Sequence, residues 1–551
     1  MTEPWIALKS SWRRRGTFMN DSRNGGAKAS PLVALFVLAL AQVGTSAENG
    51  AFSLATAEVL RVFGCSVAEV QLASTVYSLM AGTFMLASGL LGIVIGWSRT
   101  FRMGLLLVCA GELFCAFSPS IDLLIWGGRL LAGLGASLII PSVLGMVPML
   151  FEGERRKQAY GVIASSAAFA TIVPIALGLL IDTVGYRFTF GVIAVYFALL
   201  LFASTLLPHE REFGTARFDV PGAVVASLGL FMVMYGLSRV SVWGVVDPLP
   251  SAPFTVAGVS PALPIVGVGA VLLVALIPLE KWMESRRGVA ILPRSFVTNP
   301  QVRAGVVAIA LPFFYMGAQG LVATSFYQLV VGLDATKTAL LGIISGVPML
   351  VLAMVIPRKW PDINHWAVVR AGYLCIALAC ACMAAGVRDS VLSPIMVAGT
   401  LFAGIGVGLV NSQANNIVAS AVPARDSQQS GGIQGAARNL GLALGSAAVG
   451  SVLLIAMNSG LSAHAAQLPG IDDAHREALV EEVYTYEGNG AFVARMERLG
   501  VSGEQLEDLA ETNARVRSDA ASSAMGVVAV IALIALATTF PRRQADPATA
   551  A

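Results

Sequence analysis

Long apolar stretches alternate with short polar segments along almost the whole chain, from Pro31 to about residue 540. Each stretch has about 20 residues or more, which is the length that an α-helix needs to cross the hydrocarbon core of a bilayer. The pattern predicts an all-α integral membrane protein with fourteen transmembrane helices. They are expected at residues 31–57, 70–97, 101–118, 122–150, 157–183, 188–207, 219–238, 262–280, 303–331, 337–357, 365–386, 392–421, 426–457 and 520–540.

Composition agrees with a membrane protein. Of 551 residues, 56% are hydrophobic and 13% are charged, whereas globular chains carry about a quarter charged residues. Mean hydropathy is +0.74, and the net charge of +3 is small. Five of the six cysteines fall in apolar stretches, and their spacing is that of neither a metal site nor a redox pair. We therefore expect the cysteines to pack in the interior, with no disulfide, metal or cofactor.

The lysines and arginines predict how the helices are oriented. If the N-terminus is inside, the inner segments hold 23 of these residues and the short outer loops hold five. Because positively charged loops stay on the cytoplasmic side, both termini are predicted to be cytoplasmic, with residues 1–30 and 541–551 as tails. The stretch after Pro31 is too long for a signal-peptide core and is read as a retained first helix.

The segment 458–519 is the one sizeable polar piece between predicted spans. It has twelve acidic residues and five arginines, a net charge of −7. Helix-like mixtures at Glu477–Glu487 and Gly503–Arg517 favour a small helical cap outside the membrane. A solvated loop without a function of its own remains the alternative.

The fourth span, which begins with LLIWGGRLLAGLGASLIIP, carries a lone arginine in an apolar stretch. Charged residues inside membrane helices usually face a cavity or a partner, so Arg129 is a candidate functional residue. Gly133 follows one turn later, and small residues at this spacing let another helix come close. The alternative is that Arg129 extends to the membrane surface, since it lies near the start of the helix.

Acids and amides are rare inside the other spans, so each of them is a candidate functional residue. Glu48 lies in the outer half of the first span and Glu112 interrupts the third. Buried acids are commonly proton sites or counter-ions, so we expect Glu48, Arg129 and Glu112 to take part in proton coupling. Glu112 has an alternative reading, a protonated acid on a short peripheral helix. The candidates for substrate binding are Tyr77, Tyr315, Gln319, Tyr327, Gln328, Asn411, Asn415 and Arg438.

Residues 32–457 resemble the fourteen-helix drug:proton antiporters of the major facilitator superfamily. LIWGGRLLAGLG resembles the family's fourth-helix motif, with Arg129, Gly133 and Gly135 on its Arg-x-x-x-Gly-x-Gly core. Glu48, seven residues before Ala55, matches the acid of the first-helix pattern, and Tyr77 matches the tyrosine of the second helix. Further matches, in the family's order, are GYRFTF, FDVPGAVVASLGL, FYQLVVGLDATKTALLG and IQGAARNLGLALG.

The resemblance implies two six-helix halves around a central site, with two inserted helices between them. The halves would be residues 31–210 and 303–540, the second including 458–519, and residues 211–302 would hold the inserted helices and linkers. Two departures stand out. Gly96 replaces the aspartate of the loop between the second and third helices, and the fifth-helix antiporter motif survives only as Pro174 and Gly178.

The predicted function is proton-coupled export of lipophilic, cationic drugs or toxic compounds across the cytoplasmic (inner) membrane by alternating access. The proton gradient would be the energy source. The first alternative is an exporter of an endogenous metabolite, siderophore or lipid, and the second is a membrane receptor without transport. No Ser–His–acid pattern or phosphate loop is present, so the sequence predicts no enzyme. The expected partners are a small-molecule substrate, protons and the bilayer, with no nucleic acid, and the expected state is a monomer.

Overall fold

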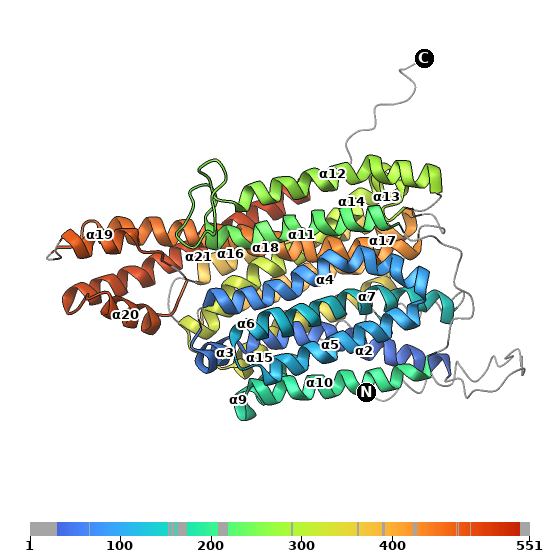
Figure 1. Cartoon of the computed structure of the whole chain (residues 1–551), viewed down its shortest axis with the longest axis horizontal. Coiled ribbons are helices and arrows are strands. Elements are labelled where there is room, and N and C mark those ends of the chain that lie inside the picture. The colour runs from blue at the N-terminus through green and yellow to red at the C-terminus, as the bar shows by residue number, and fades with distance from the viewer. Residues whose placement is uncertain are drawn as a thin grey trace, which may run out of the picture.

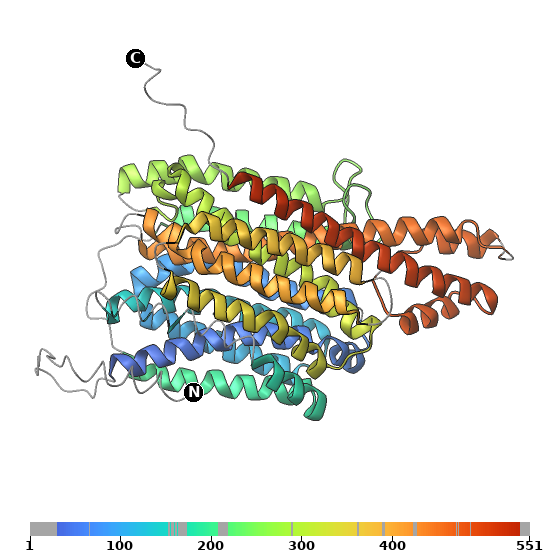
Figure 2. The same ribbon diagram turned by 180° about the vertical axis from the view of Figure 1, so that it is seen from behind.

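The chain folds into a bundle of long helices with a small helical projection at one end (Figures 1 and 2). The computed structural model describes residues 30–539 except 66, 152–154, 156–158, 160–161, 164–172, 208–218, 288–289, 361–362, 388–391, 423–426, 470, 472 and 485. Within these residues, thirteen helices are long and apolar enough to cross a membrane. They correspond to all the expected spans except the fifth. Residues 173–183 of the fifth span lie in the short apolar helix α9, Val173–Val184.

The first core of the bundle is built from helices within residues 34–234, together with Ala335 and Ala339 from later in the chain. Positive φ at Gly96 and Gly185 lets two of the turns between these helices reverse the chain within one or two residues. Their bounds are α2 Pro31–Leu54, α3 Thr56–Phe63, α4 Val67–Ile95, α5 Trp97–Phe117, α6 Ile121–Leu123, η1 Leu124–Arg129, α7 Leu130–Leu150, α10 Tyr186–Ala203 and η2 Ser204–Leu206.

The second core holds residues from Phe296 to Ala532. Its helices are α13 Arg294–Thr298, α14 Pro300–Gln319, η3 Gly320–Thr324, η4 Phe326–Val330, α15 Ala335–Lys359, α16 His365–Gly386, α17 Pro394–Ala421, α18 Ser427–Ala465 and α21 Glu504–Thr538. Between the two sets of helices in sequence come α11 Val220–Trp243 and α12 Ala262–Arg287, which pack against each other.

The described residues of segment 458–519 form a folded cap and not a loose loop. The long helices α18 and α21 run out of the bundle and are joined through α19 Asp473–Glu481 and α20 Asn489–Arg498 (Figure 1). Phe492, Met496 and Tyr484 make the cap's apolar centre, each buried completely. The expected helix at Glu477–Glu487 ends earlier, at Glu481. Beyond this point the backbone of Tyr484 forms two hydrogen bonds with the Asn458 side chain and cannot continue the helix. The Tyr484 amide donates to Asn458 Oδ1, and Asn458 Nδ2 donates to the Tyr484 carbonyl oxygen, each at 2.9 Å. We call this side of the bundle the cap end.

Candidate functional site

The π-helical turn η1 carries Arg129 into the interior of the bundle. Residues 124–129 make one wide turn before the regular helix α7 begins, and such turns are frequent at functional sites. The Arg129 side chain is fully buried, with 0% exposure. The alternative in which Arg129 extends to the membrane surface is therefore wrong.

Arg129 meets the acid that the first-helix pattern predicted. Its Nη1 forms an ion pair with Glu48 Oε1, and Glu48 is 1% exposed. The guanidinium lies between two rings, with its central carbon 4.4 Å from the centre of Phe52 and 4.5 Å from that of Tyr77. Its Nε donates to the carbonyl oxygen of Ala73 at 3.5 Å. Charge, ring contacts and hydrogen bonding together hold one geometry.

Glu112 joins the same site from α5. It is fully buried, so its helix is not peripheral at this point, and it interacts electrostatically with both Glu48 and Arg129. Neither of its oxygens has a hydrogen-bond partner among the described residues, nor has Glu48 Oε2. Two carboxyl groups therefore share one guanidinium in an otherwise apolar interior.

Glycines allow the helices of this site to come close. A Cβ on Gly135 would lie 2.6 Å from the carbonyl oxygen of Gly104 on α5, and one on Gly133 would collide with the carbonyl oxygen of Tyr77 on α4. A Cβ on Gly111 would lie 2.7 Å from the carbonyl oxygen of Gly128, beside Glu112 and Arg129. The small-residue motif of the fourth span thus packs against two neighbouring helices, as its spacing predicted.

At the cap end, α9 meets the start of α15, and η4 meets the end of α2. Asp182 of α9 accepts hydrogen bonds from the amides of Ala335, at 3.2 Å, and Thr336, at 2.7 Å, and from the Thr336 hydroxyl. These groups begin α15. A Cβ on Gly178 would lie 3.0 Å from the carbonyl oxygen of Ala335, while Pro174 lies near α2 beside Gly50. Gln328 of η4 donates to the carbonyl oxygen of Leu54 at 3.3 Å.

The other candidates for substrate binding are dispersed. Tyr315 is buried with its hydroxyl 3.6 Å from Met383 Sδ, and the Tyr327 hydroxyl lies 3.4 Å from Thr400 Oγ1. Arg438 lies over the Phe313 ring at 5.3 Å. The two half-buried amides are Gln319 and Asn411, whereas the side chain of Asn415 lies outside the described residues. Tyr77 belongs to the Arg129 site, and its hydroxyl donates to the carbonyl oxygen of Thr45 at 3.2 Å.

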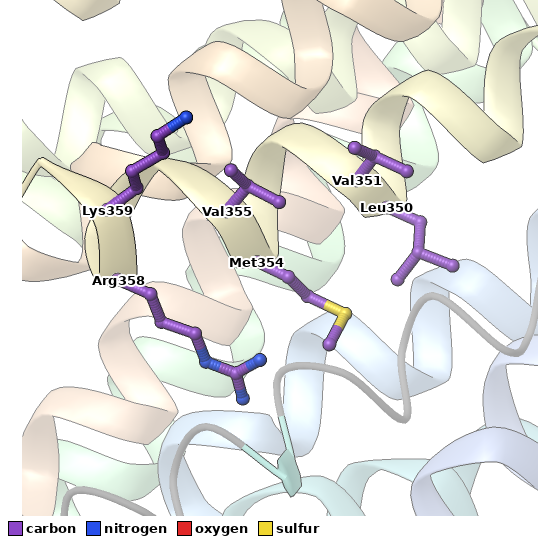
Figure 3. Close-up of a pocket in the computed structure, with 6 residues that line it drawn as sticks. All are labelled: Leu350, Val351, Met354, Val355, Arg358 and Lys359. Atoms are coloured by element: carbon purple, nitrogen blue, oxygen red, sulfur yellow. The ribbon is translucent and has the colours of Figure 1, made fainter. Parts of the chain in front are cut away.

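A hollow of about 460 Å³, open to the surface and called here the α15 cavity, lies along the last turns of α15, away from the cap end (Figure 3). Its walls are apolar apart from two cations at the end of the helix. The lining residues are Leu350, Val351, Met354, Val355, Arg358 and Lys359. None of the residues proposed for substrate binding from the sequence lines it.

Sequence reasoning missed two contributors. Phe52 lies one turn after Glu48, and its aromatic ring at that spacing was the available signal. Asp182 closes the apolar stretch of the fifth span, where it resembles an ordinary loop acid. The capped backbone lies about 150 residues further along the chain, so no local pattern could connect the two.

The comparisons with known proteins agree with this architecture. Residues 36–446 match the model of the Major Facilitator Superfamily. Among similar proteins, the probable actinorhodin transporter of Streptomyces coelicolor is 24% identical over 81% of this chain and 76% of its own. The multidrug resistance protein Stp of Mycobacterium tuberculosis is 26% identical over 75% and 74%. The multidrug efflux pump LfrA of Mycolicibacterium smegmatis is 24% identical over 92% and 94%.

Solved structures show the same fold at low sequence identity. A bacterial homolog of the human lysosomal transporter Spinster has a TM-score of 0.55 and 14% identity, covering 93% of this chain and 97% of its own. A peptide transporter in complex with sulfate has a TM-score of 0.56 and 15% identity, covering 92% and 94%. With its helical bundle and the match across residues 36–446, the chain belongs to the Major Facilitator Superfamily and is a membrane transporter, not an enzyme.

Proposed function

We propose that the chain is a proton-coupled exporter of lipophilic small molecules, with lipophilic cations as the expected class. Relatives named as a multidrug resistance protein and a multidrug efflux pump support export of drugs. The excess of Lys and Arg in alternate loops supports a cytoplasmic membrane orientation with both termini inside and the cap outside.

The observation that carries proton coupling is the group formed by Glu48, Glu112 and Arg129. If both acids were ionised, the site would hold a net charge of −1 in an apolar interior, which is costly. One proton makes the site neutral. A proton that binds here can therefore change the interactions between α2, α5 and η1 without leaving a buried charge uncompensated.

Proton coupling follows if the affinity of this site for the proton differs between the two access states of the transporter. Opening the cap end would break the contacts of Asp182 with α15 and of Gln328 with Leu54. The end of α2, which carries Leu54, also carries Glu48 and Phe52, so the movement would reach the Arg129 site directly. The energy available is sufficient, because one charge crossing 100 mV gains about 2.3 kcal/mol.

The test is transport of a cationic dye by purified protein in proteoliposomes with an imposed pH gradient. Glu48→Gln and Glu112→Gln should each lower gradient-driven flux at least about tenfold, equivalent to about 1.4 kcal/mol, while dye binding persists. Glu112→Gln should fold, because the Glu48–Arg129 ion pair remains. Asp122→Asn is the matched control, since Asp122 is an exposed acid just before η1. Undiminished flux in both site variants would refute proton coupling at this site.

A second candidate function is export of one endogenous metabolite. The α15 cavity favours it, because apolar walls ending at Arg358 and Lys359 suit an acidic lipophile better than a cation. Relatives named for single compounds, actinorhodin and tetracenomycin C, agree with a dedicated exporter. Arg358→Gln and Lys359→Gln should weaken export of an acidic amphiphile and spare the cationic dye if this candidate is right.

A further inference from the structure

Two acids of the inserted helices lie buried side by side, away from the Arg129 site. Asp219 precedes α11 and is 1% exposed, and Glu280 lies about two turns before the end of α12 and is 3% exposed. Buried acids on adjacent helices require specific partners, because an isolated buried charge is costly.

One carboxylate oxygen of each acid accepts hydrogen bonds from backbone amides. Asp219 Oδ1 accepts from the amide of Gly222 at 2.9 Å and so caps the start of α11. Glu280 Oε2 accepts from the amides of Ile291, at 2.8 Å, and Leu292, at 3.4 Å. These two residues belong to the connector that leads from α12 to α13 and α14.

The other oxygen of each acid is buried and has no hydrogen-bond partner among the described residues. These atoms are Asp219 Oδ2 and Glu280 Oε1. Both would collide with a Cβ on Gly222, so they approach the same point from two helices. A hydrogen bond between these two oxygens would join the two side chains directly. Since a carboxylate oxygen only accepts, that bond exists only when one of the two acids carries a proton.

No cation among the described residues neutralises this pair. The same segments contribute to a small buried apolar cluster of Leu90, Ala223, Ala226, Leu276 and Ile291, in which Ala223 follows Gly222 and Leu276 lies one turn before Glu280. The charged residues nearby are occupied elsewhere: Arg294 pairs with Glu284 at 3.1 Å and donates to the Lys281 carbonyl oxygen at 3.3 Å. Arg286 lies over the Trp282 ring at 5.8 Å.

We propose that Asp219 and Glu280 form a second proton-binding site, which holds one proton between Asp219 Oδ2 and Glu280 Oε1. The proton ties the start of α11 to the end of α12 and, through the Ile291 and Leu292 amides, to the connector that enters the second core. Loss of the proton leaves two negative charges facing each other and weakens this junction. Proton binding by Asp219 and Glu280 requires neither transport activity nor the group formed by Glu48, Glu112 and Arg129.

The test measures thermal unfolding of the full-length protein in detergent from about pH 5 to about pH 8, with and without substitutions. A folded protein that keeps a proton which the unfolded chain releases becomes less stable as pH rises. Glu280→Gln replaces the protonated acid, because its amide NH₂ can donate to Asp219 while its oxygen still accepts from Ile291. Asp219→Asn is the reciprocal variant. Glu284→Gln is the control, because Glu284 is a half-buried acid on the same helix that pairs with Arg294 and not with Asp219 or Glu280.

We expect the Tm of the wild type and of Glu284→Gln to fall by several degrees across this range. In Glu280→Gln and Asp219→Asn, the fall should be clearly smaller. Infrared spectra should show a protonated-carboxyl band in the wild type that is weaker in Glu280→Gln and unchanged in Glu284→Gln. Equal pH dependence of Tm in all four proteins, or an unchanged carboxyl band in Glu280→Gln, would overturn the proposal.

Discussion

The contact between Asp182 and the start of α15 should hold the cap end of the transporter closed. Asp182 satisfies the amides of Ala335 and Thr336, which are otherwise unpaired in the first turn of α15. It also places a negative charge at the positive end of that helix dipole. Asp182→Asn removes the charge and leaves one acceptor oxygen in place of two.

The size of the effect follows from the interactions that Asp182→Asn removes. A carboxylate at a helix N-terminus contributes about 0.3–1 kcal/mol, and the charge on its hydrogen bonds adds a similar amount. Because Asp182 is exposed to solvent, we take about 1 kcal/mol as the net loss. The equilibrium between closed and open states should then shift toward the open state by a factor of about five.

The assay is a spin-label distance measurement across the contact, in a background without the native cysteines. Labels at Val184 and Leu340 suit this purpose, since these side chains are 51% and 46% exposed. The long-distance population should grow in Asp182→Asn. Asp334→Asn is the matched control, because Asp334 caps the same helix through Lys337 without contacting α9. An unchanged distribution in Asp182→Asn, or an equal change in Asp334→Asn, would refute the reasoning.

Two further predictions concern the cap and the orientation. Burial raises the pKa of Glu487 and the neighbouring Arg495 opposes this rise, so Arg495→Gln should raise that pKa further. The variant loses the pairs with Glu487 and Glu482 and should destabilise the cap by about 1–3 kcal/mol where Glu487 is ionised. The loss should shrink as falling pH protonates Glu487, which hydrogen exchange at two pH values would measure. A cysteine placed in segment 458–519 should react with an impermeant reagent in intact cells, and one near Arg156 only after permeabilisation; the reverse would contradict the predicted orientation.

The pairing of Glu48 with Arg129 could be predicted because both residues are the lone charges of apolar spans. Their depths could be compared by counting residues along each helix. The place of Glu112 could not be predicted in the same way. It depends on which face of α5 meets η1, and the contact of Gly111 with Gly128 decides this. Sequence periodicity indicates that a helix has a packed face without identifying the partner.

The π-helical turns and the acid pair of the inserted helices also escaped prediction, for different reasons. A π-turn such as η1 shifts the helix register by one residue, and the apolar pattern of LIWGGR is the same with or without that shift. Asp219 and Glu280 lie at the ends of their spans, where acids are common. Only the fold shows that each has an unused oxygen facing the other.

The two rings around Arg129 explain why lysine should be a poor substitute there. An ammonium group can keep the ion pair with Glu48, but it cannot lie flat between Phe52 and Tyr77 or donate sideways to Ala73. Two ring contacts at about 1 kcal/mol each correspond to a roughly thirtyfold loss of proton-driven flux in Arg129→Lys if the arginine acts in the slow step. Phe52→Leu, which keeps apolar volume and removes one ring, should lose roughly fivefold. If Arg129→Lys transports the cationic dye at the wild-type rate, positive charge alone is sufficient and the ring geometry has no part in coupling.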